Sequence, residues 1–179
     1  FKVLGKVTIT PFSSDNVFAG NTSTAIQWTK TGLLVGGSDY NVEITVDYND
    51  NLFQADSNTV VLNPSILAAT QTWTWEDPSP AIVGIADRIT ETAYIRVRDT
   101  DGTRQDNPAV YGPFKIAGSF SNITVSDADG QTPAGTFIAG SPNTVNWTAV
   151  GAAISAVVVD YSLDNGTTWF NIVTNAAST

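Results

Sequence analysis

The sequence predicts an all-β chain of tandem β-sandwich domains in which the second domain is partial. Three observations support this fold class: apolar and polar residues alternate, turn-forming residues separate the alternating runs, and a long stretch of sequence occurs twice. No long segment has the period of an amphipathic helix, although P-S-I-L-A-A-T at 64–70 could form one helical turn.

Two segments show the alternation most clearly. In V-E-I-T-V-D-Y at 42–48, the apolar residues share one strand face and the polar residues share the other. In V-V-V-D-Y-S-L at 157–163, the odd-numbered residues are all apolar. Turns rich in Gly, Pro, Asn and Asp separate such runs. Further strands are expected at 6–10, 24–28, 59–62, 72–75, 93–98 and 110–116.

The internal repeat sets the domain organisation. Three stretches of the first copy recur in the second: 1–5 at 114–118, 18–32 at 138–151, and 46–49 at 159–162. The first and third recur 113 positions later, whereas Trp28 and Trp147 are 119 positions apart, because the loops differ in length. A repeat of about 110 residues with about seven strands has the size of an immunoglobulin-like sandwich. We therefore predict a complete immunoglobulin-like domain at 1–116 and the first part of a second one at 117–179.

The phase of the repeat raises the question of what completes the second copy. Residues 117–179 contain no counterpart of T-W-T-W-E-D-P or A-Y-I-R-V-R-D, whereas F-K-V-L-G at 1–5 resembles the closing strand of a repeat. Either the array continues and 1–5 closes a preceding repeat, or a neighbouring molecule supplies the missing strands with 1–5 as part of a donor strand. Both interpretations predict that residues 1–10 pair with a strand.

Composition limits the function. The chain has a formal net charge of −9 and only 8 Lys and Arg residues, which are scattered, so nucleic-acid binding is not expected. No apolar run is long enough to span a bilayer, so no membrane insertion is expected. The absence of Cys and His excludes disulfides, thiol catalysis and a Ser-His-Asp triad.

The composition also favours an extracellular setting. Thr, Ser, Asn and Gly are abundant, and only 14% of the residues are charged, which is typical of extracellular prokaryotic β-proteins. The chain starts at Phe1 without a Met or an apolar signal segment. We therefore expect a processed secreted protein, or a window of a longer one.

The order of these motifs resembles a known family. A Trp followed by Thr-x-x-Gly, then V-x-V-D-Y-S-x-D-x-G-x-x-W, W-T-W-E-D-P, A-x-I-R-V-R-D and G-P-F-K-I is similar to the immunoglobulin-like repeats of bacterial and archaeal surface proteins, of the Kre9/Knh-like cell-wall domain type. The resemblance implies a non-catalytic extracellular module of a surface layer, sheath or filament that packs against copies of itself. The alternative is an adhesin or a carbohydrate-binding accessory module of a secreted hydrolase, which would bind surface polysaccharide.

One motif raises the possibility of an enzyme. The spacing Ser162-x-Asp164-x-Gly166-x-Thr168-Trp169 matches the Asp-box of sialidase-type glycoside hydrolases. Each position has a role in folding, because the Asp can accept turn N–H groups, Asn-Gly supplies positive φ, and the Trp can cover the hairpin. A glycosidase needs two carboxylates flanking a cleft, and no such pair stands out in the sequence. We therefore predict a structural hairpin and no catalytic residue.

The Trp residues have a structural and a binding interpretation. Trp28 and Trp147 occupy equivalent positions and are expected in the core, since sandwiches commonly bury one Trp between their sheets. Trp73 and Trp75 share one strand face. They are expected to pack in a core or an interface, with an exposed sugar-stacking platform as the alternative.

Two D-x-D-G motifs are candidate Ca²⁺ loops, although polar β-turns are the alternative because neither continues to a distal Glu. Their candidate ligands are Asp99, Asp101, Asp106, Asp127 and Asp129, with Asp15 in a neighbouring loop. Possible N-glycosylation sequons begin at Asn21, Asn122, Asn146 and Asn165, and chance sequons are expected in so Asn- and Thr-rich a chain.

Overall fold

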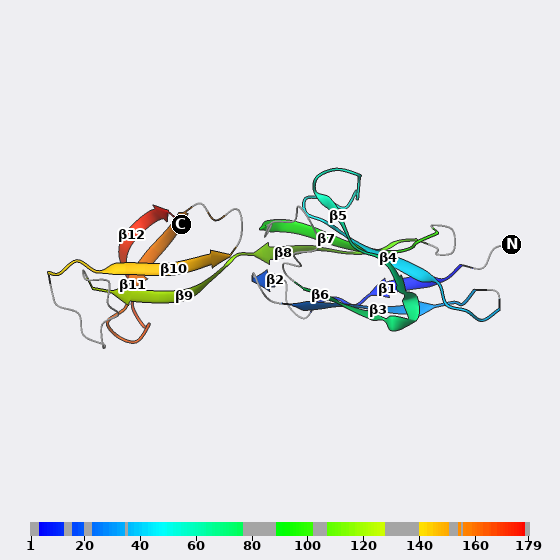
Figure 1. Cartoon of the computed structure of the whole chain (residues 1–179), viewed down its shortest axis with the longest axis horizontal. Coiled ribbons are helices and arrows are strands. Elements are labelled where there is room, and N and C mark those ends of the chain that lie inside the picture. Colours follow the sequence, from blue (N-terminus) through cyan, green and yellow to red (C-terminus); the bar gives the residue numbers. More distant parts are fainter. Residues whose placement is uncertain are drawn as a thin grey trace. The chain divides into compact units, whose positions relative to one another are not determined.

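The chain is all-β, as the sequence predicts. Its described residues form strands and one short 3-10 helix, with no α-helix among them (Figure 1). They group into two compact units, Phe1–Ala117 and Gly118–Thr179. The computed structural model describes residues 4–12, 16–19, 23–34, 36–76, 89–101, 107–127, 140–150, 154 and 156–177.

The described residues of the first unit form two sheets. One is antiparallel and has the order β1-β3-β6, formed by Lys6–Ile9, Thr24–Thr31 and Thr72–Trp75. The other has the order β2-β8-β7-β4-β5, formed by Asn16–Ala19, Ala109–Ala117, Thr90–Asp99, Asn41–Asp47 and Thr59–Leu67. Within it β2 is parallel to β8 and the remaining pairs are antiparallel.

A continuous apolar core lies between these two sheets. The predicted apolar face of β4 is fully buried, with Ile44 and Val46 both 0% exposed. Trp28 of β3 belongs to the same core, and its indole Nε1 donates a hydrogen bond of 2.9 Å to the Ala68 carbonyl. The alternation in the sequence therefore identifies the inward face of β4, which is central in its sheet because it pairs with both β5 and β7.

The opposite face of β4 is more buried than simple alternation predicts. Thr45 and Asp47 are both buried. The loop after β4 folds back over this face, and Phe53 lies under the Arg96 guanidinium at 4.5 Å from the ring centroid. Glu43 binds Arg98 Nε at 2.8 Å on the same face. The loop and the charged pair thus cover a face that alternation alone assigns to solvent.

Asp47 organises this loop. Its carboxylate accepts hydrogen bonds from the backbone N–H groups of Asn49, Asp50 and Phe53 and from the Thr59 hydroxyl. Burial raises the pKa of Asp47, but these hydrogen bonds outweigh it, so the pKa lies below its ordinary value. The side chain is therefore an ionised acceptor inside the loop.

Two local expectations are refined. The segment 64–70 is only partly helical, because β5 continues to Leu67 and the 3-10 helix η1 covers Ala68–Thr70. The opening segment pairs with a strand, since Lys6–Ile9 lie antiparallel to β3 with Val7 buried. Residues 1–3 of that segment lie outside the described residues.

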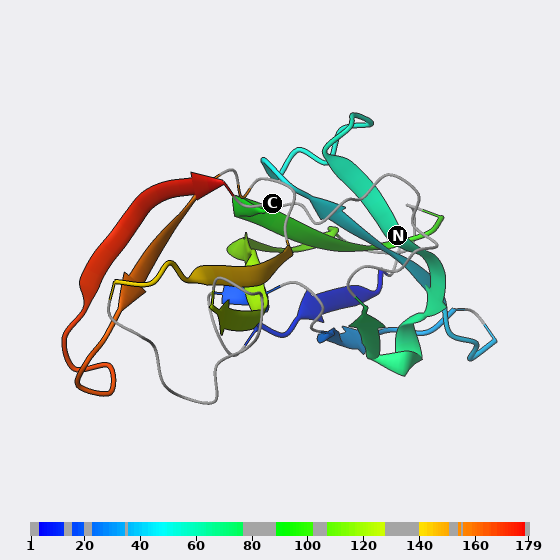
Figure 2. The same cartoon turned by 60° about the vertical axis from the view of Figure 1, so that its left-hand side comes forward.

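The described residues of the second unit form two separate two-stranded antiparallel sheets, which Figure 2 shows as distinct ribbons. One pairs β9 (Ser119–Ser126) with β10 (Thr144–Val150), and the other pairs β11 (Ala156–Tyr161) with β12 (Phe170–Ala177). Of the side chains described in this unit, only that of Ser126 belongs to a buried residue. The unit thus has strands but lacks a closed core among its described residues.

The two units share strand registers. Three partner pairs of β4–β5 recur in β11–β12 with both numbers raised by 113: Ile44–Asn63 as Val157–Ala176, Thr45–Val61 as Val158–Thr174, and Val46–Val60 as Val159–Val173. Two pairs of β1–β3 recur in β9–β10: Val7–Lys30 as Phe120–Ala149, and Thr8–Thr29 as Ser121–Thr148. Strands β9, β10, β11 and β12 therefore correspond to β1, β3, β4 and β5.

Asp160 in the second unit is a matched control for Asp47 in the first unit. We expect Asp47→Ala to lower the free energy of unfolding of the first unit by at least about 2 kcal/mol, since each buried donor left unpaired costs roughly 1–3 kcal/mol. Asp160, its equivalent 113 positions later, is exposed and accepts a hydrogen bond from the Asn171 side chain. Asp160→Ala should cost about 0.5 kcal/mol or less. Urea unfolding followed by circular dichroism measures both, and equal effects would contradict the assigned role of Asp47.

Candidate functional site

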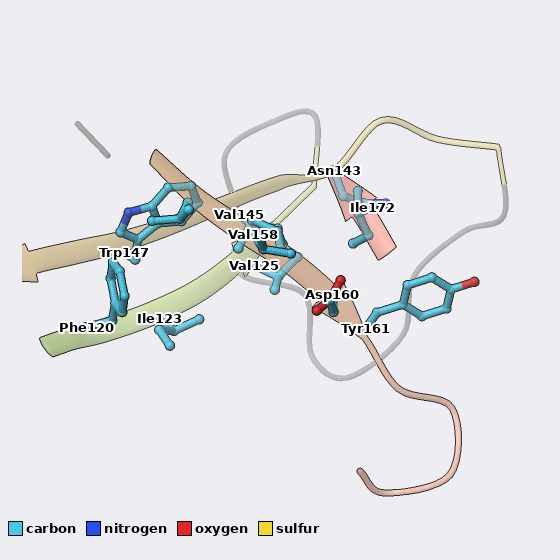
Figure 3. Close-up of a pocket in the computed structure, with 12 residues that line it drawn as sticks. Phe120, Ile123, Val125, Asn143, Val145, Trp147, Val158, Asp160, Tyr161 and Ile172 are labelled. Carbon is cyan, nitrogen blue, oxygen red and sulfur yellow. The ribbon is translucent and has the colours of Figure 1, made fainter. Parts of the chain in front are cut away.

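The candidate site is an open apolar groove in the second unit, between the β9–β10 sheet and the β11–β12 sheet (Figure 3). Its volume is about 690 Å³. Most of its lining side chains are aliphatic or aromatic and come from all four strands. They are Phe120, Ile123, Val125, Asn143, Val145, Trp147, Val157, Val158, Val159, Asp160, Tyr161 and Ile172.

Strand alternation places the β10 and β11 side chains in the groove. Val145 and Trp147 are two residues apart on β10 and therefore project from one face. Val157, Val159 and Tyr161 do the same on β11. The sequence predicts Trp147 and this apolar face of β11 to be inward-facing, and the structure brings them together. Val158 and Asp160, from the other face of β11, also belong to the lining.

A β-bulge adds the β9 residues, which sequence reasoning missed. The β9–β10 register shifts between Asn146 and Thr148, so that β9 has one extra residue there. Asn122 lies at the shift and has a φ of 51°. The bulge changes the phase of the alternation, which puts Phe120 and Ile123 on the same side of the strand. A search for regular period-two alternation cannot find such a strand.

The groove is open where the first unit is closed. In the first unit, Ile26 and Trp28 of β3 are 0% and 1% exposed, whereas the equivalent groove residues Val145 and Trp147 are only partly buried. Tyr48 beside β4 is 6% exposed. The equivalent Tyr161 is 43% exposed. The same types of residue therefore line a core in one unit and an accessible surface in the other.

Strand pairing explains this difference. In the first unit, β6 pairs with the second edge of β3 and β7 pairs with the second edge of β4. In the second unit, β10 pairs with β9 and β11 pairs with β12, and no described residue pairs with their other edges. Backbone groups on such an open edge can pair with an added strand.

The polar groups of the groove also differ from their equivalents in the core of the first unit. The Nε1 atom of Trp147 is buried and has no hydrogen-bond partner among the described residues. The equivalent Trp28 Nε1 donates to the Ala68 carbonyl. Asp160 is the charged residue of the lining, and its Oδ1 accepts a hydrogen bond of 2.9 Å from Asn171 Nδ2. The groove is thus apolar, with one buried indole N–H that lacks an acceptor.

The Asp-box residues form a tight turn between β11 and β12. Asp164 Oδ1 accepts hydrogen bonds from Thr168 N at 2.7 Å and Ser162 Oγ at 2.8 Å, and Oδ2 accepts one from Thr168 Oγ1 at 2.6 Å. Ser162 Oγ in turn accepts the Gly166 N–H at 2.7 Å. Asn165 and Gly166 have φ values of 57° and 88°, which Asn-Gly adopts readily.

These bonds determine the protonation state of Asp164. The hydrogen bonds from the Thr168 hydroxyl, the Thr168 N–H and the Ser162 hydroxyl lower the pKa of Asp164 to about 2. A carboxyl group with this pKa is ionised at neutral pH and has no proton to donate. Both of its oxygens are engaged within the turn, which is consistent with a folding role.

Trp169 lies at the base of this turn. Its Nε1 donates a hydrogen bond of 3.1 Å to the Gly166 carbonyl, which folds the indole against the turn. The residue precedes β12 and is 62% exposed, so it covers the turn only on one side.

Trp73 and Trp75 pack inward. Trp75 is buried in the core of the first unit, and Trp73 packs against that core. This arrangement favours the packing interpretation of the T-W-T-W strand over an exposed sugar platform.

The predicted metal ligands are brought together only in part. The N–H of Asp101 donates a hydrogen bond of 3.3 Å to Asp99 Oδ1, and Asp99 is buried at the end of β7. Asp127 directly follows β9, whereas Asp15, Asp106 and Asp129 lie outside the described residues. Within the described ranges, no three acidic residues lie close enough to hold a metal ion. Calcium binding stays a prediction.

The candidate glycosylation residues are mostly on the surface. Asn122, Asn146 and Asn165 are exposed, and Asn122 Nδ2 donates a hydrogen bond of 3.4 Å to Thr148 Oγ1. Asn21 lies outside the described residues. Glycosylation at these positions likewise stays a prediction.

Comparison of the chain with protein-family models, curated proteins and solved structures found no match. No helix in the described part of the chain is long and apolar enough to cross a membrane. The function is therefore inferred from the geometry of the groove and of the hairpin.

The pKa of Asp164 generates a pH prediction. Because its folded pKa of about 2 lies below the ordinary value of 3.8, its stabilising contribution should be present above pH 3.8 and lost as the pH falls toward 2. We expect the NMR shifts of the carboxyl carbon and of the Thr168 amide to titrate with a midpoint near pH 2. Asp164→Asn should abolish the titration of the Thr168 amide. A midpoint near 3.8 would contradict the hydrogen-bonded turn.

The two equivalent Trp residues generate a stability prediction. We expect Trp28→Ala to lower the unfolding free energy of the first unit by about 3–5 kcal/mol, because it leaves a cavity in a closed core. Trp147→Ala should cost the second unit about 1 kcal/mol or less, because Trp147 is only partly buried and lines an open groove. Hydrogen exchange measured by mass spectrometry resolves the stability of each unit. Similar losses for both variants would mean that the second unit has a closed core.

Proposed function

We propose that the chain is a non-catalytic extracellular structural module of a bacterial or archaeal surface layer, sheath or filament, built from tandem immunoglobulin-like sandwiches that assemble by β-strand and domain packing. The observation that carries this proposal is the groove of the second unit, where apolar side chains lie beside two strand edges. Exposed apolar surface of this kind marks interaction sites, and open edges accept added strands.

Strand order supports the immunoglobulin-like part of the proposal. In the first unit, the first, third and sixth strands form one sheet, while the fourth, seventh and eighth are neighbours in the other. Immunoglobulin-like sandwiches divide their strands between sheets in a similar way and bury a Trp between them. Here Trp28 of β3 is that buried residue. The registers shared by the two units support a tandem arrangement.

The hairpin supports a non-catalytic role. Both carboxylate oxygens of Asp164 accept hydrogen bonds within the turn, and the low pKa keeps the group ionised. Glycoside hydrolysis requires one carboxyl group to act as an acid beside a second carboxylate. In the first unit, the loop after β4 is organised by Asp47 instead, so equivalent hairpins use different residues for the same folding purpose.

The extracellular setting rests on the sequence. A chain without Cys that is rich in Thr, Ser, Asn and Gly, and whose motif order resembles surface-protein repeats, suits a cell-surface module. Partners would then be further copies of the same module and, at the cell surface, polysaccharide.

An adhesin or carbohydrate-binding module is the second candidate, because aromatic residues occur in the groove. Phe120, Trp147 and Tyr161 belong to its lining, and aromatic faces stack on sugars. Carbohydrate recognition also needs polar groups directed at hydroxyls, and the lining supplies few beyond Asn143 and Asp160. The predominance of aliphatic residues favours a protein strand as the occupant.

Sedimentation velocity of the chain over a range of concentrations tests the proposed function. We expect the wild-type chain to form larger species as its concentration rises, because the groove buries apolar surface on association. Val159→Asp, which places a charge in the groove, should keep the chain monomeric. Leu163→Asp is the matched control, because Leu163 is 80% exposed at the hairpin and is not part of the lining.

Two other outcomes would contradict assembly through the groove. A wild-type chain that stays monomeric and binds surface polysaccharide in a way that Trp147→Ala abolishes would favour the carbohydrate-binding candidate. Equal association of the Val159→Asp and Leu163→Asp variants would remove the groove from the assembly.

A further inference from the structure

The structure also indicates what kind of partner the groove accepts. We propose that the free edge of β11 binds an extended strand in the antiparallel register that β7 has on β4, with small or β-branched apolar residues at alternate positions. This inference rests on the proposed function, because it specifies the partner chemistry of the same groove. The proposed occupant is a strand of β7 character that no described residue of the second unit provides.

The register shared by the two units supports this strand position. In the first unit, Ile44 and Val46 of β4 stand opposite Val97 and Ile95 of β7, and all four side chains are buried. Val157 and Val159 of β11 occupy the positions of Ile44 and Val46 by their pairing with β12. An added strand in the β7 register would therefore place its inward residues opposite Val157 and Val159.

The described residues of the second unit supply no counterpart of the apolar side chains that β7 contributes to the core. Ala93, Ile95 and Val97 of β7 belong to the same buried cluster as Trp28. In the second unit, Trp147 and Tyr161 belong to the lining of the open groove. An added strand with three inward apolar residues would cover such side chains, as β7 does in the first unit.

The outward side chains of β7 pair with an acidic residue of β4 that has no acidic equivalent on β11. Glu43 of β4 forms ion pairs with Arg98 Nε at 2.8 Å and Arg96 Nη2 at 3.7 Å. The equivalent of Glu43 on β11 is Ala156, and the equivalent of Thr45 is Val158. The β11 edge therefore gives no acidic partner to an Arg at the position of Arg98. We infer that the natural occupant has an uncharged residue there.

A β7 peptide with the sequence T-E-T-A-Y-I-R-V-R-D (90–99) is a suitable probe for this edge. The chain contains no Cys, so one introduced thiol reports one position. We expect the full chain carrying Ala156→Cys to form a disulfide under mild oxidation with the peptide carrying Arg98→Cys. Directly opposite residues bring their Cβ atoms within about 5 Å. Peptides carrying Val97→Cys or Asp99→Cys should react no more than a scrambled peptide, because neighbouring side chains point to the other face.

Two controls on the chain accompany this experiment. The chain carrying Leu163→Cys presents a thiol on the exposed hairpin and should show no preference among the peptides. Ala156→Glu should raise the affinity of the Arg-containing peptide by roughly two- to fivefold, as expected for an exposed ion pair, whereas Ala156→Gln should not. A peptide with Thr in place of Arg98 should bind the wild-type chain as well as the Arg98-containing peptide does, because Ala156 offers no acidic partner at that position.

The outcomes separate this inference from the proposed function. Capture at a different peptide position, or no preference among positions, would overturn the proposed register. A chain that associates through the groove but captures no peptide would overturn the inference and leave the proposed function intact, with a second copy as the occupant. A chain that neither associates nor captures a peptide would contradict both.

Discussion

The pairing of β7 with β4 is the interaction on which the closed core of the first unit depends. It pairs the backbone N–H and C=O groups on the second edge of β4. It also places Ile95 and Val97 opposite Ile44 and Val46, so that backbone pairing and apolar burial occur together. The second unit repeats β4 and β5 as β11 and β12, but its described residues supply no strand in the place of β7. Together with the missing counterpart of β6 beside β10 among the described residues, this missing pairing accounts for the contrast between a closed core and an open groove. The proposed function follows from the groove.

The sequence predicts much of this fold because alternation reports strand faces. It identifies the inward face of β4, the equivalent face of β11 and the Trp on β3. It misses β9, because the bulge at Asn122 breaks the alternation and brings Phe120 and Ile123 to one side. It places Thr45 and Asp47 on the polar face of β4 but does not reveal that a loop held by the Asp47 carboxylate covers this face. Bulges and loop cover depend on tertiary pairing, which local periodicity does not contain.

Only part of the candidate site was predictable in its residues, and its role was not. Trp147 and the apolar face of β11 are core residues by their pattern, and the equivalent positions of the first unit are indeed core. Their exposure in the second unit depends on which strands are paired, and a pattern within one strand cannot report this. The role of the Asp-box, in contrast, could be predicted from the local sequence. Asn-Gly and the Asp side chain determine the turn, and the hydrogen bonds of Asp164 stay within residues 162–168.

Backbone amide exchange in β11 of the dilute chain tests most directly whether the second unit presents an open strand edge. The account predicts that the β4 amides, which belong to a strand paired on both sides, exchange slowly, while alternate amides of β11 exchange far faster. It further predicts that the β11 amides become protected when an added strand occupies the groove. Protection of β11 equal to that of β4 in the dilute, unpartnered chain would contradict the account, because the edge would then already be paired.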